Sequence, residues 1–93
     1  MKIRILKSFR EKLIEQVDYI AKDKPGAARK FKSDVLKRIQ DIPSMPFVCR
    51  RSIFFDREDI RDLVFKGYII VYKVDESEGM ITVFGFSKYQ NQV

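Results

Sequence analysis

The pattern of hydrophobic and polar positions is clearest over residues 60–74, where β-branched and aromatic residues dominate and a single break falls at Lys66-Gly67. This pattern predicts a β-hairpin, because such residues favour strands and Gly67 can adopt the positive φ that a two-residue hairpin turn requires. The residues that face each other on one side of this hairpin are Phe65 with Tyr68, Leu63 with Ile70, and Arg61 with Tyr72. We expect the rest of the chain to fold around this hairpin.

The other face of the predicted hairpin is also largely apolar. It carries Val64 opposite Ile69, and Val71 opposite Asp62. The helices of a small domain can cover one face of a sheet, but a second apolar face needs a second cover. We therefore expect Val64, Ile69 and Val71 to bind a partner protein.

Two amphipathic helices are predicted before the hairpin. The first begins with a capping box from Ser8 to Glu11, and its apolar residues recur at spacings of three and four until the helix ends near Lys22. The second begins at Pro25, which suits the first turn of a helix, and it ends before Pro43. Because the linker between them is short, the two helices should form an antiparallel helical hairpin.

The remaining segments are predicted to be strands. Residues 1–7 alternate between charged and apolar positions, residues 47–55 and 80–86 are rich in strand-forming residues, and residues 56–59 form a polar turn. The order is therefore β-α-α-β-β-β-β. This order predicts an α+β fold in which the helical hairpin packs on one face of a small, mainly antiparallel sheet.

Length and composition limit the possible functions. We expect the 93 residues to form a single domain, residues 1–93, and no apolar run approaches the about 20 residues of a membrane span. The chain has no His and one cysteine, Cys49, so an internal disulfide and the usual zinc and His-based catalytic sites are unavailable. We expect no metal, no cofactor, no membrane contact and a reducing cytoplasm.

The net charge of +6 is unevenly distributed along the chain. Residues 24–51 contain eight bases and two acids, giving 8 − 2 = +6, whereas residues 52–81 contain four bases and seven acids, giving 4 − 7 = −3. The basic segment suits nucleic acid or an acidic protein surface, and it is equally consistent with a solvated helix face.

Two stretches resemble a known family. They are Pro-Gly-Ala-Ala-Arg-Lys-Phe at residues 25–31 and the hairpin Ile-Arg-Asp-Leu-Val-Phe-Lys-Gly-Tyr-Ile-Ile-Val-Tyr-Lys-Val at residues 60–74. Together with the order of elements, they resemble the RelE/ParE superfamily of toxins from type II toxin-antitoxin systems. The resemblance implies a cytoplasmic toxin that arrests bacterial growth, serves plasmid stabilization and forms a hetero-oligomer with its antitoxin. An extended or helical segment of the antitoxin would wrap around the sheet and helices.

The superfamily contains two activities, and the resemblance leaves both open. In nuclease members an arginine commonly follows the Gly-Tyr of the hairpin, but this chain has Ile69 there and lacks His. These departures favour the ParE-like, non-catalytic inhibition of DNA gyrase. The alternative is a RelE-like, metal-independent endonuclease that cuts mRNA on the ribosome. The residues that would serve it are Arg50, Arg51, Arg61, Lys88 and Tyr89.

These candidates also have structural explanations. Arg61 opposite Tyr72 suits a cation-π pair or a ladder pair that holds the hairpin together. Arg50 and Arg51 point to opposite faces of a strand, so at most one of them can serve a given site. A third possibility is a non-toxic member that acts only as a corepressor bound to its antitoxin.

Overall fold

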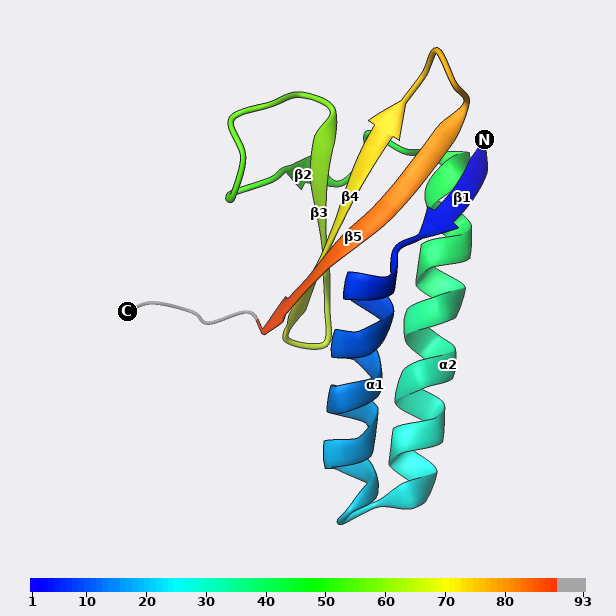
Figure 1. Cartoon of the computed structure of the whole chain (residues 1–93), viewed down its shortest axis with the longest axis vertical. Helices are drawn as coiled ribbons and strands as arrows, with labels where there is room; N and C mark the ends of the chain where they lie inside the picture. Colours follow the sequence, from blue (N-terminus) through cyan, green and yellow to red (C-terminus); the bar gives the residue numbers. More distant parts are fainter. Residues whose placement is uncertain (89–93) are drawn as a thin grey trace.

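The computed structural model describes residues 1–88 and contains one five-stranded sheet with a helical hairpin against one face (Figure 1). The elements are, in chain order, β1 (Lys2–Ile5), α1 (Lys7–Ala21), α2 (Pro25–Asp41), the short 3-10 helix η1 (Ile42–Ser44), β2 (Arg50–Arg51), β3 (Ile60–Phe65), β4 (Tyr68–Asp75) and β5 (Met80–Lys88). This order confirms the predicted α+β fold. No helix in this part of the chain is long and apolar enough to cross a membrane.

The central hairpin, formed by β3 and β4, has the predicted register, with Phe65 opposite Tyr68 and Arg61 opposite Tyr72. Both residues of its turn have positive φ, 49° at Lys66 and 83° at Gly67. These values belong to the primed turn whose twist matches that of the two strands. The sheet order is β1-β5-β4-β3-β2, and only the β1–β5 pair is parallel. The sheet is therefore mainly antiparallel, as predicted.

The start of α1 differs from the prediction. The helix begins at Lys7, Leu6 is its N-cap residue, and no side chain caps it, so the predicted Ser8–Glu11 capping box is wrong. The hydroxyl of Ser8 instead donates a hydrogen bond to the backbone carbonyl of Phe84, at 3.2 Å. Phe84 lies at a β-bulge, where the register between β4 and β5 shifts. The helix start is thus fixed by the sheet and not by its own side chains.

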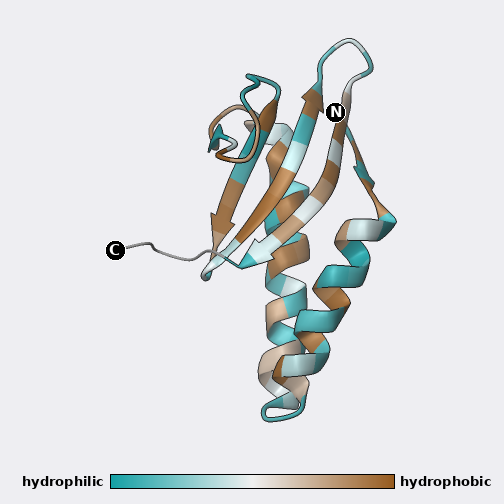
Figure 2. Ribbon diagram, turned by 60° about the vertical axis from the view of Figure 1, so that its left-hand side comes forward, coloured by the Kyte–Doolittle hydropathy of each residue, from teal (hydrophilic) through white to brown (hydrophobic). Residues whose placement is uncertain are grey.

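The main core lies between the sheet and the two helices. It is built from thirteen buried residues: Phe9, Leu13, Phe31, Val35, Ile39, Ile42, Leu63, Ile70, Tyr72, Val74, Ile81, Val83 and Phe86. Figure 2 shows the helices behind the sheet and the loop between β2 and β3 on the opposite side. We call this opposite side the second face of the sheet.

The second face is partly covered by the chain itself. Ile69 and Val71 are buried there together with Ile60, and Phe84 packs against them. The ring of Phe55, from the loop between β2 and β3, contacts the ring of Phe84 at 5.7 Å between centroids. The expectation that Ile69 and Val71 lack a cover within the chain is therefore wrong, because neither is exposed.

The predicted strand over residues 47–55 is also wrong, since only Arg50–Arg51 form β2. The N–H of Ser52 still donates to the carbonyl of Ile60 on β3, at 2.8 Å, but the backbone that follows bonds to side chains. The N–H of Ile53 donates to the carboxylate of Asp62 at 3.0 Å, and the N–H of Phe54 donates to the hydroxyl of Ser52 at 3.2 Å. These bonds turn residues 52–59 into a loop despite their strand propensity. At the other end, β5 runs two residues further than predicted, to Lys88.

Candidate functional site

Arg50 and Arg51 lie on β2, the edge strand, and both contact carboxylates. A terminal nitrogen of Arg50 is 3.5 Å from Asp62, and Arg51 forms ion pairs with Asp56 and Glu58, the latter at 2.8 Å. The hydrogen bond to Glu58, followed by the charges of Glu58 and Asp56, raises the pKa of Arg51. Both guanidinium groups are thus engaged by the protein's own acids.

Arg61 connects the segments on both sides of β2. It donates hydrogen bonds to the backbone carbonyls of Glu58 at 2.9 Å and of Cys49 at 3.1 Å, and its side chain is only 15% exposed. It also pairs with the Glu58 carboxylate at 3.2 Å. Its guanidinium lies over the ring of Phe47, 5.0 Å from the centroid. A cation-π contact therefore exists, but with Phe47 and not with the predicted Tyr72.

Asp62 is the buried carboxylate of this region, and its role was not apparent from the sequence. The residue is 2% exposed, and its Oδ2 accepts the hydrogen bond from Ile53. Its Oδ1 has no hydrogen-bond partner among the described residues. The available signal was an acid in the middle of an apolar strand face, where an unpaired charge is unfavourable. Asp62 anchors the loop to β3.

Lys88 lies far from these arginines. It pairs with Tyr68 at the end of β5 that is close to the hairpin turn, whereas Arg51 pairs with Arg61. From residue 61 to residue 65 the strands advance about 13 Å, and three strand spacings add about 14 Å across the sheet. Tyr89, the fifth predicted residue, lies outside the described residues. The structure thus keeps the arginines at one corner and Lys88 at another.

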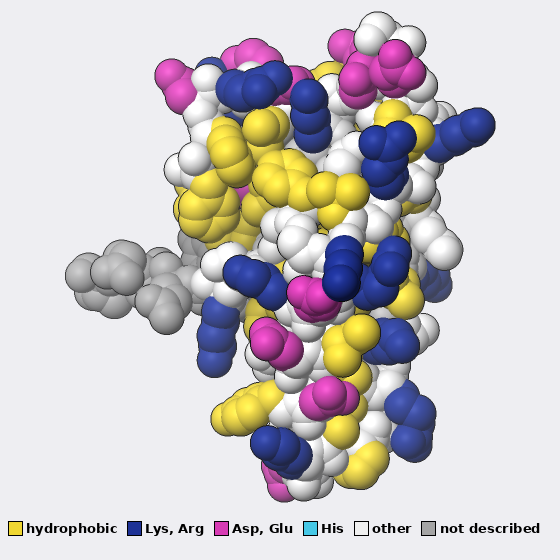
Figure 3. All heavy atoms as spheres, in the orientation of Figure 1, with side chains coloured by type: hydrophobic (Ala, Val, Ile, Leu, Met, Phe, Trp, Pro, Cys, Tyr) yellow, Lys and Arg dark blue, Asp and Glu magenta, His cyan; other side chains and the backbone are white. Residues whose placement is uncertain are grey.

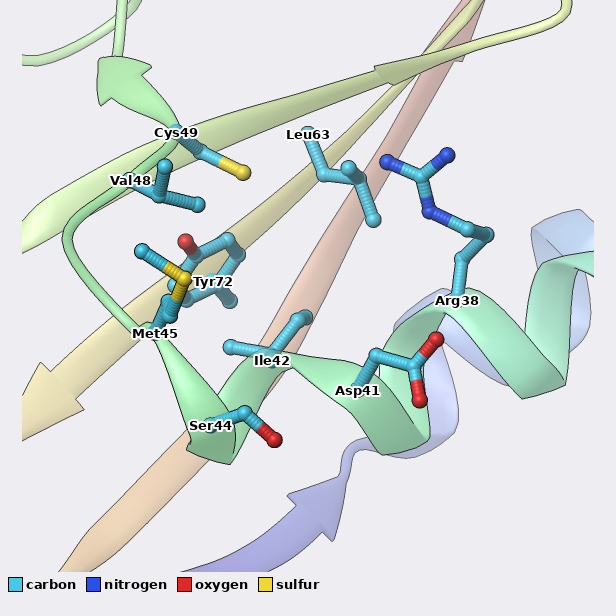
Figure 4. Close-up of a pocket in the computed structure, with 9 residues that line it drawn as sticks. All are labelled: Arg38, Asp41, Ile42, Ser44, Met45, Val48, Cys49, Leu63 and Tyr72. Carbon is cyan, nitrogen blue, oxygen red and sulfur yellow. The ribbon is translucent and has the colours of Figure 1, made fainter.

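A cavity of about 330 Å³ opens between the end of α2, η1 and the segment that leads into β2 (Figure 4). Its lining residues are Arg38, Asp41, Ile42, Ser44, Met45, Val48, Cys49, Leu63 and Tyr72. The hydroxyl of Tyr72 donates to the carbonyl of Pro46 at 2.6 Å. Burial, and next the thiol of Cys49, raises the pKa of Tyr72. A tyrosine in this state is a poor general base.

A cluster of charged residues joins α2 to the hairpin turn. Lys66 and Lys30 both bind the carboxylate of Asp34, at 2.9 and 3.1 Å. The hydrogen bond from Lys66, and then that from Lys30, lowers the pKa of Asp34. Arg38 and Lys66 both lie over the ring of Phe65, at 5.4 and 5.3 Å from its centroid. This cluster holds the hairpin turn against α2.

Within residues 1–88, no group of His, Cys, Asp and Glu side chains could hold a metal ion. Two sets of backbone groups remain available for a partner. β2 pairs only with Arg61 and Asp62 of β3. In the described part of the chain, the outer edge of β3 therefore continues without a neighbouring strand beyond Asp62, where Val64 is 43% exposed. β1 forms the opposite edge of the sheet.

The fold is similar to that of a solved toxin structure. The crystal structure of the isolated E. coli RelE toxin is similar over 98% of this chain and 86% of that chain, with a TM-score of 0.59 and 14% sequence identity. The family described as the ParE toxin of the type II toxin-antitoxin system, parDE, matches residues 3–89. The chain therefore belongs to the ParE toxin family, and the predicted membership of the RelE/ParE superfamily is confirmed. No match was found among the curated proteins.

Family membership has a direct consequence for the partner of this chain. A toxin of a type II toxin-antitoxin system has an antitoxin as its partner, so the predicted antitoxin partner is confirmed at the level of the family.

Proposed function

We propose that this toxin acts as a non-catalytic inhibitor of DNA gyrase, as a ParE-like toxin. The observation that carries the proposal is the state of the predicted catalytic arginines. Arg50, Arg51 and Arg61 are each within ion-pair distance of a carboxylate, and they are separated from Lys88 by the width of the sheet. Within residues 1–88 the three arginines and Lys88 do not meet in one acid-base site, and this separation favours action by binding.

Cleavage of RNA at a ribose 2′-OH makes specific demands on a site. A base must take the hydroxyl proton, a cation must stabilise the phosphorane, and an acid must protonate the leaving oxygen, all within hydrogen-bond reach of one phosphate. Acids that already neutralise the arginines compete with that phosphate. Tyr68, the residue paired with Lys88, is no better a base, because burial, followed by the proximity of Tyr19, raises its pKa.

Ile69 supports the same conclusion. Nuclease members of the superfamily commonly carry an arginine at this position of the hairpin. Here Ile69 is 2% exposed and packs with Val71 and Ile60 on the second face. An apolar residue in an apolar cluster leaves no cation for a phosphate at this position.

We further propose that the antitoxin covers the open edge of β3. An extended antitoxin segment can add a strand beside residues 63–65, where the backbone has no neighbouring strand. Val64 would then contact the antitoxin, in agreement with the prediction from the sequence. Ile69 and Val71 would stay inside the toxin.

Two reactions separate the candidate functions. The first is DNA supercoiling by purified gyrase, which the wild-type toxin should inhibit at a concentration well below that of a heat-denatured control. The second is primer extension on a defined mRNA with translating ribosomes. Cuts at the ribosomal A site that disappear in Lys88→Ala/Tyr89→Ala would establish the endonuclease instead. A folded toxin that is inactive in both reactions and does not arrest growth would favour the corepressor.

A further inference from the structure

The second face of the sheet carries a row of positive charge. Arg4 on β1 pairs with Thr82 on β5, and Thr82 pairs with Lys73 on β4. Because Ile3 and Ile5 pack with the helix-side core, Arg4 between them points to the second face. Arg4 and Lys73 are thus two strand spacings apart, about 10 Å. In residues 1–88, neither of them forms an ion pair with a carboxylate.

Beside this basic row, the second face is apolar. Ile53 is 63% exposed, Phe54 50% and Phe55 40%, and the ring of Phe55 contacts Phe84. Together with Val64, which is 43% exposed, these side chains form an apolar patch, and exposed apolar patches often serve binding on monomers. Figure 3 shows hydrophobic side chains gathered toward the β2–β3 loop.

The segment that contains and surrounds the exposed apolar residues, residues 45–65, carries no net charge. Residues 45–65 contain four arginines and four acids, giving 4 − 4 = 0, so the rest of the chain holds the whole net charge of +6. Each of the four arginines is within ion-pair distance of an acid of the same segment. The pairs are Arg50 with Asp62, Arg51 with Asp56, Arg57 with Asp59 at 2.7 Å, and Arg61 with Glu58. Nucleic acid is a poor fit for this segment, because phosphates gain little from cations that are already neutralised.

We propose that this surface, which we call the docking face (Arg4, Lys73, Ile53, Phe54, Phe55 and Phe84), binds DNA gyrase through an apolar protein surface bordered by carboxylates. The inference rests on the proposed function. The apolar part supplies the water-excluding centre that a protein interface needs, and the basic row beside it extends the contact. Acidic residues on gyrase would face Arg4 and Lys73, which steers association and fixes orientation.

A second copy of this chain fits the docking face less well. Arg4 and Lys73, the charged residues of the docking face, are positive, and each copy carries +6, so two copies would meet with like charges. The antitoxin is proposed to bind elsewhere, at the open edge of β3. The docking face and this edge adjoin at Val64, so a bound antitoxin would stand next to the gyrase contact.

The test is the inhibition of DNA supercoiling by purified gyrase. Ile53→Ser/Phe54→Ser removes exposed apolar surface, and Arg4→Glu/Lys73→Glu reverses the basic row. We expect each pair to raise the half-inhibitory toxin concentration at least tenfold. The matched controls, Ile14→Ser on α1 and Lys32→Glu on α2, are exposed residues of the helical side, and they should leave inhibition unchanged. Circular dichroism melting should show all variants folded.

The outcomes separate this inference from the proposed function. Wild-type toxin that does not inhibit gyrase refutes both. Wild-type toxin that inhibits, together with docking-face variants that inhibit equally well, refutes only the docking face. A folded variant pair that inhibits gyrase fully but no longer retains the co-expressed antitoxin, or that converts a dimer into a monomer in sedimentation velocity, assigns the face to another occupant and overturns the inference.

Salt provides an independent readout. If carboxylates of gyrase face Arg4 and Lys73, inhibition by the wild-type toxin should weaken as salt rises, because exposed charge pairs are screened. Inhibition by Ile53→Ser/Phe54→Ser should keep this salt dependence, and inhibition by Arg4→Glu/Lys73→Glu should lose it. Equal salt dependence in both pairs would contradict the role of the basic row.

Discussion

The carboxylate of Asp62 accepts a hydrogen bond from the backbone N–H of Ile53 at 3.0 Å, and this bond joins the loop after β2 to the middle of β3. Because Asp62 is buried, water competes little for its carboxylate. The loop carries Phe55 onto Phe84 and so helps to cover the second face. One buried acid thus determines whether the exposed residues Ile53 and Phe54 are presented in a fixed position.

Replacing Asp62 with alanine should destabilise the toxin by about 1–3 kcal/mol, because the N–H of Ile53 loses its partner in a partly buried site. Asp62→Asn keeps an acceptor oxygen and should lose less. Chemical denaturation followed by circular dichroism measures both values. Hydrogen exchange should also become faster over residues 52–59 in Asp62→Ala. Equal stability of Asp62→Ala and wild type would show that the bond does not hold the loop.

Arg61 should prove to be a structural residue. Arg61→Lys keeps the charge but cannot make the separate bonds to Glu58 and Cys49, so we expect it to lose about 1–3 kcal/mol of stability, close to the loss in Arg61→Ala. Arg57→Ala is the matched control, because its exposed ion pair with Asp59 is worth less than about 1 kcal/mol. Denaturant midpoints compare the three variants. An Arg61→Lys protein with wild-type stability and no toxicity would instead indicate a direct role in function.

The hairpin could be predicted in full from the sequence because its register depends on neighbouring residues and on one turn. The β2 region could not, because its conformation depends on the buried carboxylate of Asp62, which lies on the next strand. Residues 47–55 have strand propensity, but Asp62 and Ser52 bind the backbone that a longer strand would need. In the same way, the family pattern identifies Arg51 and Arg61 but not the carboxylate of Glu58, which binds both.

Gly85 should be required for the packing of the second face. A Cβ at this position would lie 2.9 Å from the Cβ of Val71, its partner across the strands. Gly85→Ala should therefore lose about 1–3 kcal/mol through overpacking. Val71→Gly in the same chain removes the opposing Cβ, which Val71→Ala would keep, and should recover part of the loss. Gly26 is the control, since a Cβ there meets nothing closer than 3.9 Å and α2 should gain from Ala. Thermal unfolding measures the stability of the two single variants at positions 85 and 71, of the double variant and of Gly26→Ala. Additive losses in the double variant would rule out a direct clash between the two positions.

The contact between the hairpin turn and α2 should contribute to stability in a pH-dependent way. Lys66, and then Lys30, lowers the pKa of Asp34 below its usual value by hydrogen bonding. A carboxyl with a lowered pKa in the folded state adds stability above its unfolded pKa of about 3.9, and this stability is lost as the pH falls through the folded pKa. Lys66→Met should raise the pKa of Asp34, measured by NMR titration, and should reduce the acid-side loss of the melting temperature. Lys37→Met, a change on the same helix at a residue without an ion pair to Asp34, is the control. A pKa of Asp34 that is the same in wild type and Lys66→Met would contradict the contact, because the hydrogen bond from Lys66 is its largest single cause.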